Sequence, residues 1–92
     1  MNTKMVITEH ARFEAKRRGI DLEFILSTIE NPQQKVPSKR NRFVLQTKYH
    51  DKIVNGEMLL RVIVESDNDM VKVISVYKTS KIEKYWIGGV GI

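Results

Sequence analysis

Arg61 is the residue of this sequence with the clearest chemical potential, because it is a charged residue inside an apolar run. It interrupts the stretch from Met58 to Val64, whose composition is typical of a β-strand. A guanidinium stays charged in proteins and is costly to bury unless a carboxylate, a phosphate or water accompanies it. The structural hypothesis is therefore a solvent-facing arginine, or an ion pair with Glu65 or Asp69. The functional hypothesis is a clamp that holds a phosphate group with paired N–H donors.

His10 and Tyr77 are the candidates for proton transfer or for positioning a substrate. An imidazole works as a general acid or base near neutral pH, although a surface histidine without a chemical role is the plainer interpretation of His10. Tyr77 lies at the end of a strand-like run, and Ser75 shares its face if that strand is regular. His50 and Asp51 make an incomplete set of metal ligands. We therefore predict no metal and no other cofactor.

Positive charge gathers near the N-terminus, around residue 40 and after the last strand-like run. The residues concerned are Arg17 and Arg18, then Lys39, Arg40 and Arg42, then Lys78, Lys81 and Lys84. The last group is followed by Tyr85 and Trp86, and basic residues interleaved with aromatic rings suit single-stranded RNA, whose bases stack on such rings. Alternatively, Tyr85 and Trp86 close one end of the core or contact a partner protein. The candidates for substrate binding are Arg17, Arg18, Arg42, Ser75 and Lys78.

Two helices are expected to position the N-terminal part of these candidates. The first begins after Thr8, a suitable N-cap, and ends at Gly19, which suits a left-handed C-cap. Helical spacing places His10 and Arg17 on one stripe of this helix, so they can act together. The second helix covers residues 21–31 and has a wide apolar face, which predicts a structural role.

Strand-like runs follow at residues 42–49, 58–65 and 70–77, with a short one at 34–36. Turn residues separate the last three runs, so neighbours in sequence are expected to pair as an antiparallel meander. We therefore predict an α+β fold in which two N-terminal helices pack on one face of a four-stranded antiparallel sheet. The alternation of side chains places Arg61 on the face opposite the valine row.

Length and composition restrict these hypotheses further. The chain has 92 residues and is 41% hydrophobic, which predicts one domain over residues 1–92 with a core at 6–85. It has no cysteine, so a disulfide framework and thiol catalysis are excluded. The sequence lacks the apolar core of a signal peptide and any membrane-spanning run, and we expect a cytoplasmic protein. A net charge of +5 favours a polyanionic partner such as nucleic acid.

Several short motifs, taken in order, resemble a known group of proteins. They are His10-Ala11, Arg18-Gly19-Ile20, Asn31-Pro32 and the strand from Val73 to Tyr77. Over about residues 6–85 the sequence is similar to small bacterial domains of unknown function that are grouped with RelE-type toxins. That wider group shares an α+β fold with barnase-like, EndoU-like and colicin-like ribonucleases. The resemblance therefore implies a RelE-like fold.

The resemblance also implies an activity, a metal-independent hydrolase of the endoribonuclease class that acts on mRNA or another cellular RNA. In such enzymes the ribose 2′-OH attacks the adjacent phosphate and leaves a cyclic phosphate and a 5′-OH. His10 would be the general base or acid, Arg61 would hold the scissile phosphate with Arg18 or Lys78 assisting, and Tyr77 would position or protonate. The implied partners are RNA and a small acidic antitoxin encoded nearby, as in bacterial toxin–antitoxin systems.

Glu14 departs from the pattern of the relatives, which usually have a basic residue one turn after the histidine. It is expected to pair with His10 or Arg18, or to mark weakened catalysis. The alternative function is therefore a non-catalytic module of the same fold that binds RNA or a partner protein.

Overall fold

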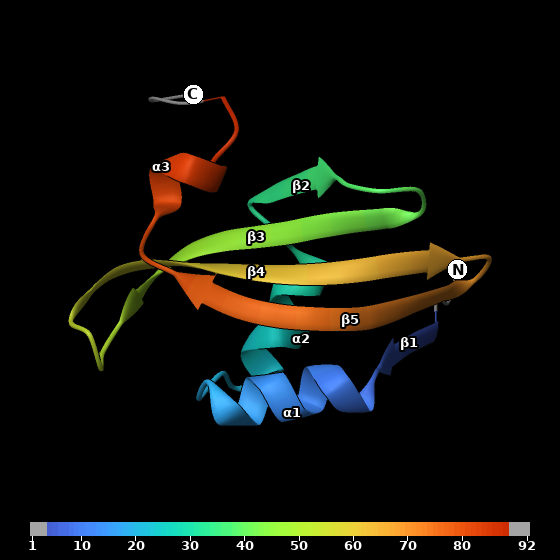
Figure 1. The fold of residues 1–92 in the computed structure, drawn as a ribbon, viewed down its shortest axis with the longest axis horizontal. Coiled ribbons are helices and arrows are strands. Elements are labelled where there is room, and N and C mark those ends of the chain that lie inside the picture. The colour runs from blue at the N-terminus through green and yellow to red at the C-terminus, as the bar shows by residue number, and fades with distance from the viewer. Residues whose placement is uncertain (1–3, 89–92) are drawn as a thin grey trace.

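Within residues 4–88, a mixed β-sheet of five strands forms the centre of the fold, in the spatial order β1-β5-β4-β3-β2 (Figure 1). The computed structural model describes residues 4–88. Along the chain the elements are β1 (Lys4–Ile7), α1 (Glu9–Arg17), α2 (Leu22–Glu30), β2 (Gln34–Pro37), β3 (Arg42–Asp51), β4 (Gly56–Asp67), β5 (Met70–Thr79) and α3 (Ile82–Tyr85). The predicted fold class, α+β, is confirmed.

Strands β2 to β5 form the predicted antiparallel meander, in which each strand pairs with the next one along the chain. Asn55 and Asn68 lie in the two hairpin connections of β3–β4 and β4–β5, and both have a φ of 56°. Asparagine adopts this left-handed conformation more readily than most other residues that carry a side chain. The short strand predicted at residues 34–36 is present as β2.

The prediction of a four-stranded, purely antiparallel sheet is wrong, because β1 adds a fifth strand that runs parallel to β5. Lys4 pairs with Met70 and Ile7 pairs with Val73, so the partners lie at opposite ends of the chain. Parallel strands meet only through a long connection. A segment of four residues that is not bounded by turn residues therefore carries no local indication of its partner.

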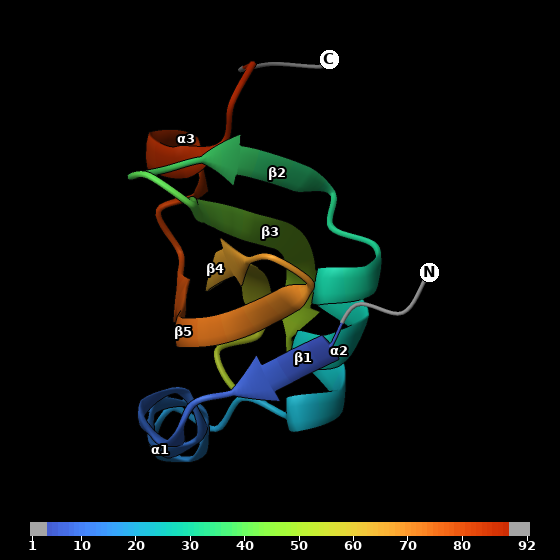
Figure 2. The same cartoon turned by 90° about the vertical axis from the view of Figure 1, so that its right-hand side faces the viewer.

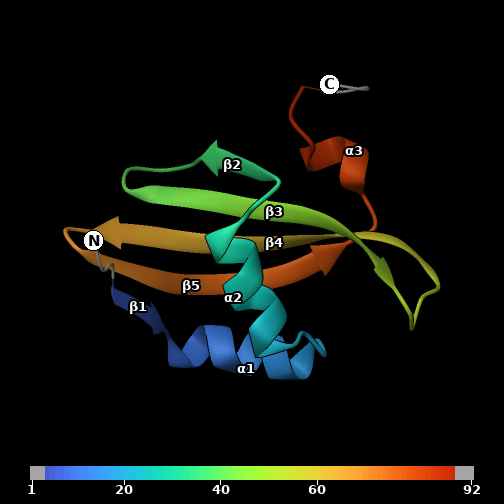
Figure 3. The same ribbon diagram turned by 180° about the vertical axis from the view of Figure 1, so that it is seen from behind.

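The two N-terminal helices begin where predicted, but they occupy different places. Thr8 caps α1 by accepting a hydrogen bond from the backbone N–H of Ala11 (3.2 Å), and its hydroxyl donates to the carbonyl oxygen of Val73 (2.8 Å). α2 crosses one face of the sheet, whereas α1 lies along the edge beside β5 (Figure 2, Figure 3). The prediction that both helices cover one face is thus correct for α2 and only partly correct for α1, whose Ala11 and Ala15 still reach the core.

The apolar core lies between the helices and one face of the sheet. Ile25 of α2 packs there against Val62 of β4 and Val76 of β5, and all three are fully buried. Because side chains alternate along a strand, Arg61 points to the opposite face, as predicted. That face carries α3 (Figure 2). Within residues 4–88, no helix is both long and apolar enough to cross a bilayer.

Candidate anion-binding site

Arg61 is the centre of a polar cluster on the sheet face that carries α3. Its Nε donates a hydrogen bond to Oε1 of Gln46 (2.9 Å), and its Nη1 donates to the hydroxyl of Tyr77. The guanidinium carbon lies 4.0 Å from the centre of the Tyr85 ring and 5.7 Å from that of Tyr77. An arginine over an aromatic ring is stabilised by the electrons of the ring face. We call Arg61, Gln46, Tyr77 and Tyr85 the Arg61 cluster.

The guanidinium of Arg61 has only neutral partners in this cluster. Glu65, one of the two carboxylates considered from sequence, instead contacts Arg42 at 3.6 Å. None of the ion pairs within residues 4–88 includes Arg61, and Asp69 is exposed in the turn before β5. A guanidinium has five N–H donors, of which the two bonds above use two. Within residues 4–88, the half-buried guanidinium therefore has N–H donors beyond those two bonds, and such donors suit an anion.

The register of the sheet explains why these side chains meet. Gln46, Arg61 and Tyr77 stand at paired positions on β3, β4 and β5, and paired residues point to the same face. Ser75 pairs with Ile63, two positions along from the pair of Tyr77 and Arg61. The register shift of this strand pair comes only after Ile63, so the strand is regular between Ser75 and Tyr77. The predicted shared face of Ser75 and Tyr77 is thus confirmed.

Tyr77 and Tyr85 differ in how readily they lose a proton. Their rings meet edge to face with 6.3 Å between centres. A hydrogen bond from the Tyr77 hydroxyl lowers the pKa of Tyr85, and the nearby charges of Lys84 and Arg61 act in the same direction. Burial raises the pKa of Tyr77, against the opposing effect of Arg61. Tyr85 therefore loses its proton more readily than Tyr77.

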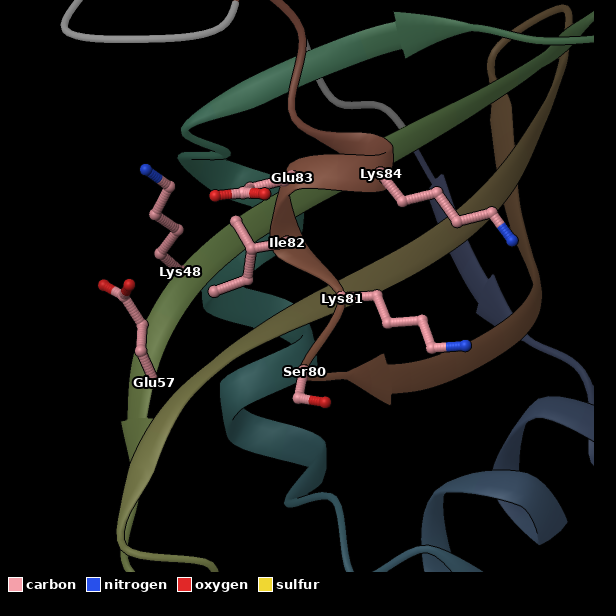
Figure 4. Close-up of a pocket in the computed structure, with 7 residues that line it drawn as sticks. All are labelled: Lys48, Glu57, Ser80, Lys81, Ile82, Glu83 and Lys84. Carbon is pink, nitrogen blue, oxygen red and sulfur yellow. The ribbon is translucent and has the colours of Figure 1, made fainter.

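A shallow groove of about 690 Å³ runs beside the cluster, between α3 and the ends of β3 and β4 (Figure 4). Lys81 and Lys84 extend together to one side of α3, while Lys48 and Glu57 lie on the other side (Figure 4). The ammonium of Lys48 lies 4.0 Å from the centre of the Trp86 ring. This face thus combines cations with aromatic rings, the combination predicted from the sequence.

The structure places four of the predicted binding residues in ion pairs away from the Arg61 cluster, and one of them is Arg42 with Glu65. Arg17 and Arg18 both donate to Oε1 of Glu14, at 2.9 and 2.7 Å, and their hydrogen bonds lower the pKa of this carboxyl, that of Arg18 most strongly. Of the pairings expected for Glu14, the one with Arg18 is confirmed. Lys78 points to the helix-covered face and contacts Asp51 at 3.1 Å.

His10 lies exposed in the first turn of α1. Within residues 4–88, no side-chain hydrogen bond or ion pair connects it with Arg61 or Tyr77. The structure therefore brings Arg61 and Tyr77 together and leaves His10 outside their network. Arg42 lies further along β3, at the opposite end of this face from α3.

Sequence reasoning missed two members of the cluster. Gln46 is fully buried, and its only signal is that it interrupts the apolar beginning of β3. Tyr85 was expected to stack on a base or to close the core. Its contact with Arg61 was missed because it depends on the chain turning back over the sheet after Thr79. Neither signal identifies a partner without the register.

Comparison with known proteins places the chain in a family. Residues 7–78 match the model of a domain of unknown function, DUF4258, and the chain belongs to this family. Searches among curated proteins and among solved structures give no significant match. The expected kind of family, a domain of unknown function, is thereby confirmed. The matched range includes Gln46, Arg61 and Tyr77 and ends before Tyr85.

Proposed function

We propose that the Arg61 cluster binds a phosphodiester of RNA and that the protein is a metal-independent endoribonuclease. The observation that carries the proposal is the half-buried guanidinium, whose partners among residues 4–88 are all neutral. A charge in this setting is stabilised further by an anion, and a phosphate matches the fork of an arginine. The rings and lysines around it suit a single strand with exposed bases.

The proposed reaction is attack of the ribose 2′-oxygen on the adjacent phosphorus, with a cyclic phosphate as product. A bond forms between the 2′-oxygen and phosphorus, the bond from phosphorus to the 5′-oxygen breaks, and the proton lost by the 2′-OH is balanced by one gained by the 5′-oxygen. Arg61 stabilises the negative charge that develops on the phosphoryl oxygens. Tyr85 accepts the 2′-OH proton in its deprotonated form, which its lowered pKa makes easier to reach. Tyr77, whose pKa is raised, keeps its proton and donates it to the 5′-oxygen that leaves.

The biological setting that we propose is a RelE-like toxin with a small acidic antitoxin as its partner. The support is the resemblance of the motifs that begin at His10-Ala11 and Arg18-Gly19-Ile20, together with the excess of positive charge. In this setting the growth of a bacterial host is expected to stop when the protein is expressed. Substitution Arg61→Ala is expected to relieve the arrest.

A second candidate function is a non-catalytic module that binds RNA or a partner protein. It is favoured by the position of His10, which is exposed and outside the hydrogen bonds of the cluster. Without that imidazole the cluster has arginine and tyrosine as its ionisable groups. Such a set binds a phosphate, but it offers fewer proton donors and acceptors for cleavage.

The test is cleavage of purified RNA in the presence of EDTA by the wild type, Arg61→Ala, His10→Ala and Arg12→Ala. Arg12 is an exposed cation on α1 and serves as the control. Arg61→Ala is expected to lower the cleavage rate by about 10² to 10³, as for other donors to a developing anion. Arg12→Ala is expected to cleave normally. RNA binding without cleavage by the wild type would support the second function, and absence of both would contradict RNA cleavage and RNA binding alike.

A further inference from the structure

The segment from Ile82 to Ile87, which we call the C-terminal arm, supplies Tyr85 to the Arg61 cluster but has little apolar anchorage of its own. None of the residues in α3 is buried, and a helix of four residues is not stable by itself. Ile87 is exposed. The arm must therefore be held in place by specific polar and ring contacts with the sheet.

Gln46 provides the first of these contacts. Its side-chain Nε2 donates to the backbone carbonyl of Tyr85 (3.1 Å) and to Oε1 of Gln34 (2.7 Å). Its Oε1 accepts from Arg61 at 2.9 Å. Gln46 is fully buried, and a buried amide is stable only when its groups are hydrogen-bonded. One side chain thus links the guanidinium to the arm that carries the tyrosine.

Gln34 provides the second contact, at the far end of the arm. Its Nε2 donates to the carbonyl of Ile87 (2.7 Å), and its Oε1 accepts from the backbone N–H of the same residue (3.0 Å). The same Oε1 also accepts from Gln46. Gln34 therefore imitates a β-strand partner for Ile87 and at the same time fixes the orientation of the Gln46 amide.

We propose that Gln34 and Gln46 are positioning residues that dock the C-terminal arm, and that the anion site at Arg61 is complete only while the arm is docked. This inference rests on the proposed function, because it assumes that the Arg61 cluster binds a phosphodiester. Docking brings the Tyr85 ring over the guanidinium and places Trp86 beside Lys48. Binding and docking are then linked, so an anion at Arg61 favours the docked arm as much as docking favours the anion.

Two substitutions weaken the contact between Gln34 and Ile87, one from each side. Gln34→Met keeps an unbranched side chain of similar length and loses the hydrogen bonds of Gln34 to Ile87 and to Gln46. Ile87→Pro removes the backbone N–H that donates to Oε1 of Gln34 and changes no residue of the sheet. Trp86 already has the extended backbone required before a proline (φ −72°, ψ 126°). The matched control is Gln33→Met, because Gln33 bonds to the backbone of Lys48 instead of the arm.

Trp86 is the only tryptophan of the chain, so its fluorescence reports on the arm directly. Quenching by acrylamide is measured with and without a short 2′-O-methyl RNA oligonucleotide, which lacks the attacking hydroxyl and stays intact. Gln34→Met and Ile87→Pro are expected to increase quenching and to weaken oligonucleotide binding about three- to tenfold. Saturating oligonucleotide is expected to restore the protection of Trp86. Gln33→Met is expected to change neither quantity.

Two results overturn the inference while leaving the anion site intact. One is wild-type protection of Trp86 in both variants, which would show that Gln34 does not hold the arm. The other is an exposed Trp86 with unchanged affinity, which would show that the arm is not part of the site. Failure of the anion site itself has a different signature, in which Arg61→Ala binds the oligonucleotide as tightly as the wild type, and it overturns the inference as well.

Discussion

At the scale of single residues, the half-buried guanidinium of Arg61 is held by neutral side chains from β3, β5 and α3. An arginine inside an apolar strand is conspicuous in a sequence, and alternation alone assigns it to the face opposite the core. Its carboxylate partner was sought among Glu65 and Asp69, which are near in sequence. The actual partners are Gln46, Tyr77 and Tyr85, and they meet Arg61 through the register of three strands and the return of the arm.

Tyr85→Phe separates binding from proton transfer. The phenyl ring can still lie over the guanidinium, so RNA affinity is expected to change little, while the cleavage rate falls about 10²-fold because the proton acceptor is lost. Tyr49→Phe is the matched control, since the Tyr49 hydroxyl donates to Asp51 on the helix-covered face. Equal cleavage by Tyr85→Phe and the wild type would contradict the assigned role.

The same role predicts a pH dependence for the wild type. The hydrogen bond from Tyr77 lowers the pKa of Tyr85, so its deprotonated form is reached at a lower pH than for a free tyrosine, near 10. The rate is therefore expected to rise with pH until Tyr85 has lost its proton. This rising limb is expected to disappear in Tyr85→Phe when initial rates are measured across the pH range.

At the scale of elements, local signals located most of the structure. Thr8 and Gly19 mark the ends of the first helical segment, and Gly19 has the left-handed φ of 68° that its position predicts. The strands of the meander were found because turn residues separate them. β1 and α3 were not identified, because one is defined by a remote parallel partner and the other by contacts with a distant sheet face.

Asp51 ties two of these elements together at the end of β3. Its Oδ1 accepts from the backbone N–H groups of Ile53 and Val54, and its Oδ2 accepts from Lys78 of β5 and from Tyr49. These bonds, that of Val54 first and that of Lys78 second, lower the pKa of Asp51 to about 2. The carboxylate thus fixes the turn before β4 and its position relative to β5.

The lowered pKa of Asp51 predicts a loss of stability in acid. Since the group is more acidic in the folded chain, its stabilising contribution is complete above the ordinary aspartate pKa, near 4. The contribution is lost as the pH falls toward about 2. Urea unfolding between pH 7 and pH 2 is expected to show this decline in the wild type.

Asp51→Asn is expected to be less stable than the wild type at pH 7, and its stability should fall less steeply in acid. Asp67→Asn provides the control, since Asp67 is exposed and lies in the hairpin between β4 and β5. An identical pH profile for Asp51→Asn and the wild type would show that this carboxylate does not contribute to the acid response.

At the scale of the whole molecule, the net charge of +5 was too coarse to identify a surface. Part of the positive charge is paired locally, since Arg17 and Arg18 share the carboxylate of Glu14 and Lys78 pairs with Asp51. The cations that remain near the Arg61 cluster include Lys81 and Lys84, which extend to the same side of α3 (Figure 4). Fold and charge pattern together therefore favour the face that carries α3 as the surface for the proposed RNA binding.

If Lys81 and Lys84 contact phosphates, RNA binding must depend on salt through them. The double variant Lys81→Ala/Lys84→Ala is expected to bind the 2′-O-methyl oligonucleotide more weakly. The slope of log affinity against log salt concentration is expected to fall by about 1.4 for a single strand. The double variant Arg12→Ala/Lys16→Ala removes the same charge from α1 and should keep the wild-type slope. Equal slopes for the two double variants would exclude α3 from the RNA path.

The central claim is that the guanidinium of Arg61 receives a phosphate of RNA, and nuclear magnetic resonance can observe this group directly. The side-chain Nε–H of Arg61, which donates to Gln46, is followed in isotope-labelled protein while the 2′-O-methyl oligonucleotide is added; Arg61→Ala identifies the signal. We predict a saturable shift of the Arg61 signal with the same midpoint as the Trp86 fluorescence change, and no comparable shift for Arg12. Saturation of the protein with RNA while the Arg61 signal stays in place would contradict the claim.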